Sequence, residues 1–300
     1  MKPGAARGEE RLAWALTAPA LAMVLLVAVF PLAWTVWESL HLHDLRMPWL
    51  GRPFVGLDNY AELARDARFW RSLAHTAAFT FVTVALELVL GLALALAMSR
   101  AFRGRGLVRA AVLVPWAIPT VVAGLLWRFA FDADAGLVNA LLLDAGVLRE
   151  GPVWLAGSLS AWVPVVLADV WKTTPFVALL LLAGLQNVDA ALLEAAAVDG
   201  AGAWRRLWHV TLPLLRPAIL VALVFRTLDA FRVFDLVYVL TGGGPGTSTE
   251  TVALYTHSTL LQSLRFGYGS AMSVAVFLVT FGLAMLYVRW LGGSREGDSR

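Results

Sequence analysis

Residues 12–37 read LAWALTAPALAMVLLVAVFPLAWTVW, an apolar run of 26 residues without a charged side chain. An α-helix rises about 1.5 Å per residue, so this run is long enough to cross the roughly 30 Å hydrocarbon core of a bilayer. Small residues at 17–22 are similar to a signal-peptide cleavage site, but the apolar region of a signal peptide is shorter than this run. The stretch therefore predicts a retained transmembrane helix.

Five more stretches are long and apolar enough to cross a membrane: 72–99, 107–131, 160–185, 214–240 and 268–292. Of the 300 residues, 59% are hydrophobic and only 15% are charged, so a single compact core in water cannot hide the apolar side chains. A lone helix satisfies its own backbone in lipid, and the alternating segments of about ten residues that mark a β-barrel are absent. The sequence predicts an all-α integral membrane protein with six transmembrane helices.

The composition excludes several kinds of chemistry. The chain has no cysteine, which removes thiolate nucleophiles, cysteine-based zinc sites and redox pairs. Lys2 and Lys172 are its only lysines, and neither lies in a GxxxxGK[ST] phosphate loop, so any ATP and Mg²⁺ must be bound by another chain. Metal-binding histidine spacings, a GxSxG motif and basic patches with interleaved aromatic residues are also missing. We expect no cofactor on this chain, no catalytic residues and no nucleic-acid partner.

The distribution of basic residues predicts the orientation in the membrane. Thirteen Lys and Arg residues lie in segments 1–11, 100–109, 186–216 and 289–300, against seven in segments 38–71, 132–159 and 241–267. Basic residues accumulate on the cytoplasmic side. We therefore expect a multi-pass protein of the bacterial cytoplasmic (inner) membrane, in contact with lipid, whose N-terminal segment 1–11 and tail 293–300 are both cytoplasmic.

Eight charged residues fall inside the predicted spans: Glu87, Arg128, Asp169, Lys172, Arg226, Asp229, Arg232 and Asp235. Each charge at membrane depth costs at least about 2.5–3.5 kcal/mol on insertion scales. Since positive and negative charges are equal in number, we expect them to pair and to face protein or a watered cavity.

The third cytoplasmic segment has helical sequence of its own. Asp189 is placed to cap a helix over Ala190–Val198, and Gly200 follows where a left-handed C-terminal residue is favoured. A second short helix is expected over Ala201–Val210, before Pro213. Two roles suit the first helix: it lies on lipid headgroups, or it presents one carboxylate among small side chains to another protein.

This segment also carries a recognisable motif. EAA-x-x-DGA at 194–201, followed by V-x-LP-x-x-x-P at 210–217, resembles the EAA loop of permease subunits in binding-protein-dependent ABC importers. In that family the loop is a coupling helix that inserts into a cleft of the ATPase subunit, which favours the second role. The resemblance implies a type I ABC importer permease fold with these ATPase-docking residues: Glu194, Ala195, Ala196, Asp199, Gly200, Leu212 and Pro213.

Other stretches resemble the carbohydrate-uptake branch of this family, in particular the first permease of trehalose- and maltose-type importers. They are FVGLDNY at 54–60, DVWKTTP at 169–175, FRTLDAFRVFD at 225–235 and LTGGGPG at 240–246. The extra N-terminal spans and the large periplasmic insertion of the maltose permease are absent from this sequence. The resemblance implies an oligosaccharide substrate such as trehalose or maltose, a second permease, two copies of an ATPase subunit and an external sugar-binding protein.

Charged, aromatic and hydroxyl side chains in spans two, four and five form the predicted substrate pathway: Glu87, Trp171, Lys172, Thr173, Arg226, Asp229, Arg232, Asp235 and Tyr238. An aromatic ring stacks on the CH face of a sugar, while charged and hydroxyl groups bind its OH groups. Structural ion pairing and helix packing around Pro175 are the alternative roles for these residues. On a continuous helix, the three-residue spacing from Arg226 to Asp235 winds around the axis, so we expect that these four charges cannot all face one cavity.

In the second span, a stripe at helical spacing is expected to face protein or a cavity, with the threonines serving helix packing. Its members are Thr76, Thr80, Thr83, Glu87 and Gly91.

The glycine run at 242–246 suits a hinge, a binding-protein contact or a plain loop. An ion-coupled secondary transporter would also explain buried charges, but it predicts broken helices at matching positions in two halves of the chain, and Pro175 marks the only clear interrupted charged site.

Overall fold

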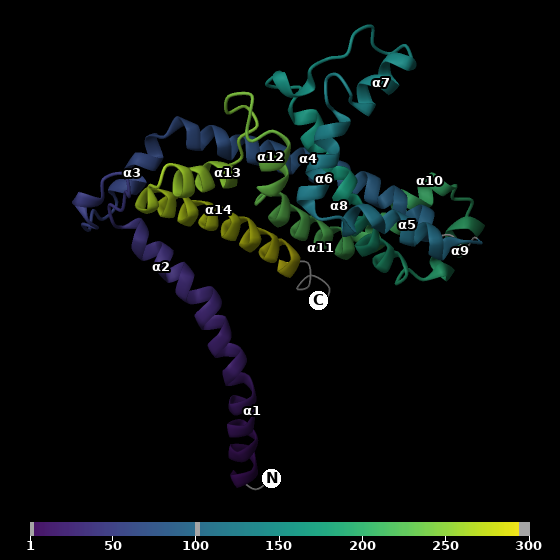
Figure 1. The fold of residues 1–300 in the computed structure, drawn as a ribbon. Helices are drawn as coiled ribbons and strands as arrows, with labels where there is room; N and C mark the ends of the chain where they lie inside the picture. The colour runs from purple at the N-terminus through teal and green to yellow at the C-terminus, as the bar shows by residue number, and fades with distance from the viewer. Residues whose placement is uncertain (1–2, 100–102, 294–300) are drawn as a thin grey trace. The chain divides into compact units, whose positions relative to one another are not determined.

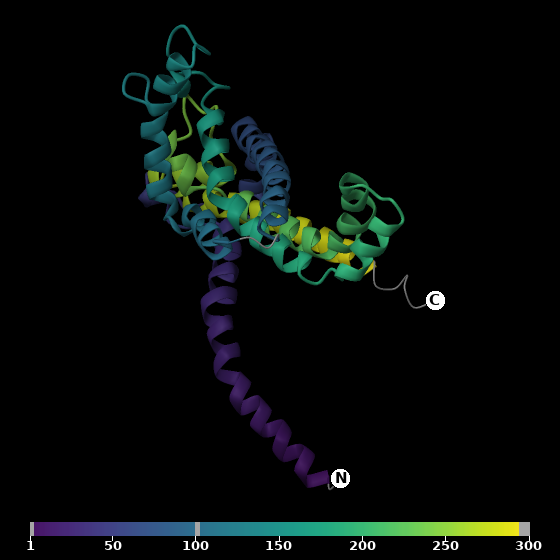
Figure 2. The same cartoon turned by 90° about the vertical axis from the view of Figure 1, so that its right-hand side faces the viewer.

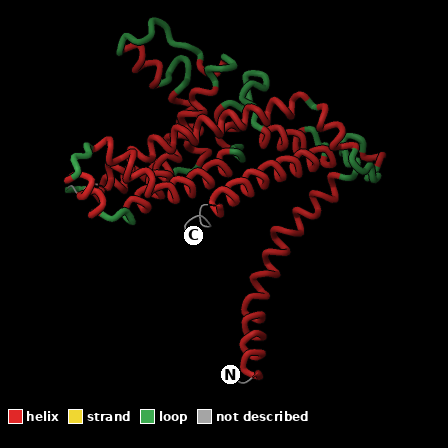
Figure 3. Tube along the Cα trace, turned by 180° about the vertical axis from the view of Figure 1, so that it is seen from behind, coloured by secondary structure: helices red, strands yellow, loops and turns green. Residues whose placement is uncertain are grey.

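The computed structural model describes residues 3–99 and 103–293, and every named element in these ranges is helical (Figures 1 and 3). The chain divides into two compact units, one made of 1–66 and 256–278 and the other of 67–255 and 279–300. Residues 294–300 of the expected tail and the first two residues of the expected N-terminal segment lie outside the described residues.

The elements follow one another as α1 (Pro3–Val24), η1 (Leu25–Val29), α2 (Phe30–Ser39), η2 (Pro48–Leu50), α3 (Asp58–Arg65), α4 (Ala67–Ser99), α5 (Arg105–Ala117), α6 (Thr120–Ala130), α7 (Leu137–Asp144), η3 (Trp154–Ala156), α8 (Trp162–Leu185), α9 (Ala190–Val198), α10 (Ala203–Arg206), η4 (Leu207–Thr211), α11 (Leu212–Ala230), α12 (Asp235–Leu240), α13 (Val252–His257), η5 (Ser258–Gln262) and α14 (Phe266–Gly293). The η elements are short 3₁₀ or π-helical stretches.

Five helices in the described ranges are long and apolar enough to cross a membrane alone: Trp14–Ser39, Ala67–Ser99, Trp162–Leu185, Ala203–Ala230 and Phe266–Arg289. The stretch expected as one span over 107–131 is instead broken, because α5 and α6 meet at 91°. Pro119 follows the break and disfavours helical backbone at Ile118, whose ψ is 131°. When the bent pair is counted as one span, the chain has the six that the sequence predicts, and the all-α fold class is confirmed.

The helix that leads into the fifth span differs from expectation. We expected a short helix over Ala201–Val210 that ends before Pro213. Instead one helix runs from Ala203 to Ala230, and the π-helical stretch η4 precedes the proline. Membrane helices accommodate a proline through such local adjustments of the hydrogen-bonding pattern.

The C-terminal part of the fifth span is interrupted, which corrects the continuous helix expected over 214–240. Helix α11 ends at Ala230, and α12 begins only at Asp235. The hydroxyl of Thr251 donates to the carbonyl of Val233 inside this break (3.0 Å). A partner from a distant part of the chain thus satisfies a backbone group that a continuous helix would have paired internally.

The predicted stripe on α4 faces protein. All five members are buried: Thr76, Thr80, Thr83, Glu87 and Gly91. A Cβ atom added to Gly91 would lie 2.7 Å from Cγ1 of Val177 and 3.3 Å from the backbone nitrogen of Ala178 on α8. Glycine therefore permits the close approach of α4 and α8, the two helices that carry the site described below.

In the first unit, the FVGLDNY motif ties α3 to the end of α2. The Nδ2 atom of buried Asn59 donates to the carbonyls of Ser39 (2.8 Å) and His41 (3.0 Å). The hydroxyls of Tyr60 and Ser39 lie 2.7 Å apart. These bonds satisfy carbonyls that the last turn of a helix leaves without an internal partner, so the motif has a structural role within this unit.

Candidate functional site

Arg226 lies at the centre of a buried charge cluster in the second unit. Its side chain is 2% exposed and that of Glu87 is fully buried. Nε of Arg226 donates to Oε2 of Glu87 (2.5 Å), and Nη2 donates to Oε1 (2.8 Å). Two parallel charge-assisted hydrogen bonds fix both groups in one geometry and join α11 to α4.

Two further carboxylates complete the cluster. Nη2 of Arg226 also donates to Oδ2 of Asp169 on α8 (3.1 Å), and Nη1 donates to Oδ2 of Asp229 one turn along α11. The Asp169 side chain is 12% exposed, whereas that of Asp229 is 65% exposed. Arg226 thus holds two buried carboxylates on one side and presents Asp229 to open space on the other.

Thr173 connects the cluster to the backbone of α8. Its hydroxyl oxygen lies 2.6 Å from Oε1 of Glu87 and 2.6 Å from the carbonyl oxygen of Asp169. The hydroxyl donates toward these acceptors and holds Glu87 against α8 from the side opposite Arg226. Glu87, Thr173 and Arg226, which the sequence places in three different spans, therefore meet in one contact network.

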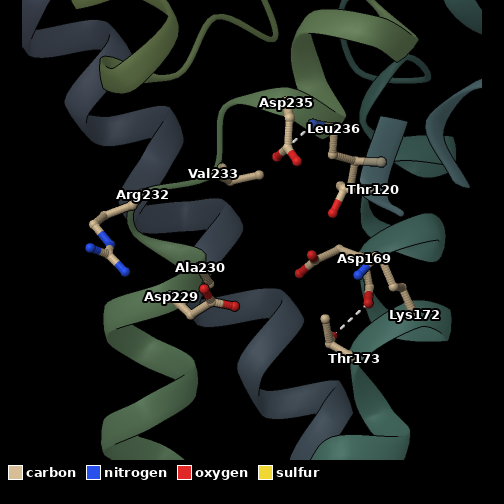
Figure 4. A pocket seen from close by; sticks show the side chains of 10 residues that line it. All are labelled: Thr120, Asp169, Lys172, Thr173, Asp229, Ala230, Arg232, Val233, Asp235 and Leu236. Carbon is tan, nitrogen blue, oxygen red and sulfur yellow. Dashed lines mark hydrogen bonds between the residues drawn. The ribbon is translucent and has the colours of Figure 1, made fainter. Parts of the chain in front are cut away.

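Two neighbouring cavities border this cluster. One, of about 370 Å³, is shown in Figure 4, where the carboxylates of Asp169, Asp229 and Asp235 lie around the same space. The other, of about 560 Å³, is lined by Arg226 and by three aromatic residues, Trp116, Phe176 and Phe225. Both cavities share the same five lining residues: Thr120, Lys172, Thr173, Asp229 and Arg232. Volumes of this order suit small-molecule sites, and the lining combines aromatic faces with charged and hydroxyl groups.

The break after α11 explains how three charges of the fifth span reach one cavity. Asp229, Arg232 and Asp235 line the smaller cavity, whereas Arg226 lines only the larger one, so neither of these two cavities is lined by all four charges. Because the helix stops at Ala230, the turn to α12 carries Asp235 back toward α8 instead of around the helix axis. The expectation assumed a continuous helix through the whole stretch, and the structure corrects that assumption alone.

Three predicted pathway residues lie outside the lining of these cavities: Glu87, which is buried in the charge cluster, and the aromatic residues Trp171 and Tyr238. The Trp171 side chain is 37% exposed and contacts Trp127 edge to face, with ring centroids 5.9 Å apart. Tyr238, 48% exposed, stacks on Phe234 with centroids 5.4 Å apart. A contact of either residue with substrate stays a prediction.

Several lining residues were missed by sequence reasoning. Trp116 and Thr120 flank the break at Pro119, and Phe176 follows Pro175 directly. A proline between apolar segments of one predicted span was the available signal, because irregular backbone at membrane depth is tolerated where it lines a cavity. The sequence also treated Asp169 only as a buried charge, although it lines the smaller cavity.

The glycine run at 242–246 forms an ordered loop of the second unit. Gly242, Gly243 and Gly246 have φ values of 62°, 89° and 61°, a region that side chains disfavour. The hydroxyls of Thr241 and Thr249 lie 2.8 Å apart across the base of the loop, and Thr249 N donates to the carbonyl of Gly243 (3.1 Å). Glycine therefore fits the backbone geometry of these three positions.

The predicted coupling segment forms a separate helical projection, shown in green in Figure 2 past the end of α8. As expected, the side chain of Asp189 caps α9 by accepting from Ala191 N (2.9 Å), and Gly200 ends the turn with φ of 80°. No residue of α9 is buried, and Glu194 is exposed. A helix rich in small side chains that the described residues leave without a buried position has the form expected of a docking element.

The remaining docking residues divide between this projection and the fifth span. Ala195, Asp199 and Gly200 are exposed, and Ala196 is half-buried. Leu212 and Pro213 are half-buried at the start of α11. The short link at 199–202, α10 and η4 connect α9 to α11 along the chain.

Comparisons with known proteins agree with this architecture. A family model described as "Binding-protein-dependent transport system inner membrane component" matches residues 87–292. The trehalose/maltose transport system permease protein MalF of Thermococcus litoralis is 43% identical over 94% of each chain. The trehalose transport system permease protein SugA of Mycobacterium tuberculosis is 44% identical over 99% of this chain and 94% of its own. The sulfoquinovosyl glycerol transport system permease protein SmoG of Agrobacterium fabrum is 41% identical over 94% of this chain and 91% of its own.

Solved structures show a similar fold. A chain of a bacterial ABC transporter involved in the import of the acidic polysaccharide alginate matches with a TM-score of 0.80 over 94% of this chain and 96% of its own, at 22% identity. The same kind of transporter in complex with an alginate pentasaccharide-bound periplasmic protein matches with a TM-score of 0.79 over 93% of each chain, at 21% identity. At these identities the likeness concerns the fold alone.

Proposed function

This chain belongs to the family of binding-protein-dependent transport system inner membrane components, and we propose that it forms one half of the sugar pathway in an ATP-driven importer. The expected resemblance and the type I importer permease fold are confirmed. The chain is a multi-pass membrane transport subunit and not an enzyme. Family membership also favours an importer over an ion-coupled secondary transporter.

The proposed substrate is a neutral disaccharide such as trehalose or maltose. The observation that carries this proposal is the pair of cavities around Asp229, where Trp116, Phe176 and Phe225 offer ring faces. Charged groups lining the two cavities are balanced in number, three carboxylates against three cations: Asp169, Asp229, Asp235, Lys172, Arg226 and Arg232. A balanced, hydrogen-bonding lining suits an uncharged sugar. The names of two relatives with 43% and 44% identity support the same substrate class.

Within the cavities, Asp229, Lys172, Thr173, Arg232 and Asp235 are proposed as sugar contacts. Glu87 and the buried edge of Arg226 are proposed to hold Asp229 in place. The geometry supports this division, since Asp229 is 65% exposed while Glu87 has no exposed side-chain surface. Trp171 and Tyr238 are proposed to contact sugar only along its path to or from the cavities.

The proposed energy source is a separate ATPase. Two copies of it would bind ATP and Mg²⁺, and one copy would grip α9 through Glu194 and its alanine neighbours. The exposure of Glu194 and the lack of any buried residue in α9 support this docking. ATP-driven closure of the two copies would move α9 and, through α10, tilt α11, which carries Arg226 and Asp229. A second permease is proposed to complete the pathway, with an external binding protein that delivers the sugar.

In this arrangement both termini and α9 face the cytoplasm of a bacterium, and 132–159 faces outward. The excess of basic residues in the proposed cytoplasmic segments, 13 against 7, supports this orientation.

Reconstitution of the complete importer with its second permease, ATPase and binding protein tests this function. We expect ATP-dependent uptake of labelled trehalose or maltose, with competition by related glucosides. Asp229→Asn should lower the uptake rate at least about tenfold because a charged hydrogen-bond acceptor is lost from the pathway, with normal copurification of the ATPase. Asp58→Asn, an exposed carboxylate on α3, is the matched control. If the importer takes up no disaccharide in the presence of ATP, the proposed substrate is contradicted. If Asp229→Asn takes up sugar at the wild-type rate, the proposed site is contradicted.

A further inference from the structure

Helix α7, in the segment 132–159, buries its polar residue Asn139 and exposes apolar side chains, with the charged Asp144 only at its last position. Asn139 is 4% exposed, whereas Leu137 and Leu141, one turn apart on the other face, are 60% and 59% exposed. A helix on a watery surface normally has the reverse arrangement. A contiguous exposed apolar face of this kind marks a surface that another molecule covers.

The loop that carries this face is held in one conformation. Nδ2 of Asn139 donates to the carbonyls of Ala133 (3.1 Å) and Pro152 (3.2 Å), and its Oδ1 accepts from Nε1 of Trp154 (2.7 Å). At Gly136 an added Cβ would lie 2.2 Å from the carbonyl oxygen of Asp132. The leucines are therefore presented on a fixed scaffold, which lowers the entropy cost of binding a partner.

A chain of ring contacts joins this loop to Trp171, the chain neighbour of a residue that lines the cavities. Trp154 contacts Phe131 (centroids 5.4 Å apart), Phe131 stacks on Trp127 (5.8 Å), and Trp127 contacts Trp171 (5.9 Å). Trp171 directly precedes Lys172, which lines both cavities. A molecule seated on α7 is thus attached to the same rigid group of residues that borders the sugar site.

Charge and position decide what kind of partner fits. The segment 132–159 holds four carboxylates and one arginine, so its net charge of −3 is repelled by anionic lipid headgroups. Figure 1 shows α7 beyond the start of α8 and α9 beyond its end. The 24 residues of α8 span about 36 Å at 1.5 Å each, roughly the thickness of a membrane. The partner on α7 is therefore on the opposite side of the membrane from any protein that grips α9.

We propose that the Leu137 and Leu141 face of α7 is a docking surface for the external sugar-binding protein. The two leucines form the apolar centre, and Asp134, Asp144 and Glu150 form an acidic rim that pairs with basic side chains of that protein. This inference rests on the proposed function, because it assigns a surface to a partner of the same importer. Sugar released from a protein docked there would leave it beside the aromatic chain that leads to Lys172.

The test compares the complete importer in lipid nanodiscs with its Leu137→Glu/Leu141→Glu variant. The probe is the importer's own binding protein loaded with trehalose. We expect at least about a tenfold weaker affinity for this probe and a matching loss of probe-stimulated ATPase activity. Basal ATPase activity and copurification of the ATPase should stay at wild-type levels, since both leucines are exposed and far along the chain from α9. Leu57→Glu, an equally exposed leucine before α3, is the matched control.

Each result separates the docking surface from the proposed function. If wild type responds to the probe and the double variant responds equally, the docking surface is wrong while the proposed function stands. If the double variant loses the response while Leu57→Glu keeps it, the docking surface is supported. If Asp144→Lys weakens binding as well, the acidic rim is supported too. A wild-type importer without any response to the loaded binding protein contradicts the proposed function itself. Equal loss in Leu57→Glu contradicts a docking surface confined to α7.

Discussion

At the scale of single residues, Arg226 contacts three carboxylates that differ in their exposure. Glu87 and Asp169 are buried around its guanidinium, while Asp229 reaches the cavity. A buried ion pair adds little net stability compared with well-packed apolar residues, yet removing one partner leaves a charge without compensation. The cluster is therefore better explained as a device that positions Asp229 than as a source of stability.

Arg226→Met should strongly destabilise the protein. Glu87 and Asp169 would remain buried without a cation, at a cost of about 3–5 kcal/mol in the free energy of unfolding. Denaturant unfolding of the purified importer in detergent measures this loss. Arg232→Met, at an exposed position near the end of the same helix, is expected to change the free energy by less than about 1 kcal/mol. Equal stability of the two variants would show that the buried carboxylates do not need Arg226.

In the first unit, we expect Asp44 to make a contribution to the stability of the fold that is lost at acid pH. It lies after the first span, and its carboxylate accepts from Nε (2.9 Å) and the backbone nitrogen (3.0 Å) of Arg46. The side-chain hydrogen bond from Arg46 is the main cause that lowers the pKa of Asp44 below its ordinary value of 3.8. A carboxyl with a lower pKa in the folded state stabilises the fold above its unfolded pKa and loses this effect as pH falls through the folded pKa.

Asp44→Asn should therefore lower the thermal unfolding temperature at neutral pH, and the gap to wild type should narrow below about pH 4. Thermal unfolding of both proteins in detergent between pH 3 and pH 7 checks this prediction. A gap that stays constant across the range would mean that ionised Asp44 makes no contribution.

At the scale of elements, two breaks determine the shape of the site. The 91° bend between α5 and α6 brings Trp116 and Thr120 to the larger cavity. The break between α11 and α12 brings Asp235 to the smaller one. Irregular backbone at membrane depth needs partners for its polar groups, and the bond from Thr251 to Val233 supplies one.

Gly91→Leu should disturb the contact between α4 and α8. The new side chain would collide with Val177, whose Cγ1 lies 2.7 Å from the Cβ position, and overpacking of this kind costs about 1–3 kcal/mol. We expect a lower unfolding temperature and slower uptake, because Glu87 shifts with α4. Gly282→Leu is the matched control, since nothing lies within 4 Å of a Cβ at that position in α14. If both variants behave alike, close packing at Gly91 is unimportant.

At the scale of the whole molecule, the second unit carries its candidate surfaces at opposite ends of α8. Helix α7 precedes α8 and α9 follows it, with the cavities along the helix between them. Among the residues that the structure describes, none covers Leu137 and Leu141 of α7 or Glu194 of α9. A protein with this layout suits the transmission of movement between two partners on opposite sides of a membrane.

Glu194→Lys should uncouple the importer without unfolding it. Glu194 is exposed, so its substitution leaves the spans intact, while the reversed charge opposes docking of the ATPase. We expect uptake and ATPase copurification to fall at least about tenfold, with an unchanged unfolding temperature. Asp58→Lys, which reverses an exposed charge on α3, should leave copurification normal. Normal copurification and uptake in Glu194→Lys would overturn the docking role of α9.

The membrane architecture, the capped helix α9 and the pairing of buried charges could be predicted from sequence. The helix predicted over 12–37 and the cap at Asp189 both depend on residues nearby in the chain. The length and apolarity of a run, and the side chain that caps a helix, can be read from the sequence directly. Equal numbers of buried positive and negative charges predicted pairing because an isolated charge in lipid is costly. Which carboxylates would meet Arg226 could not be predicted, because Glu87 and Asp169 come from other helices at unknown register.

The amino-acid order alone thus predicted the long apolar helices and the capped helix α9, since both follow from the balance of apolar and polar groups along a few turns. Only the tertiary structure decided that Asp229, Asp235 and Lys172 share a cavity. Helix breaks and close contacts such as Gly91 against Val177 set these positions, and they depend on partners far away in the chain.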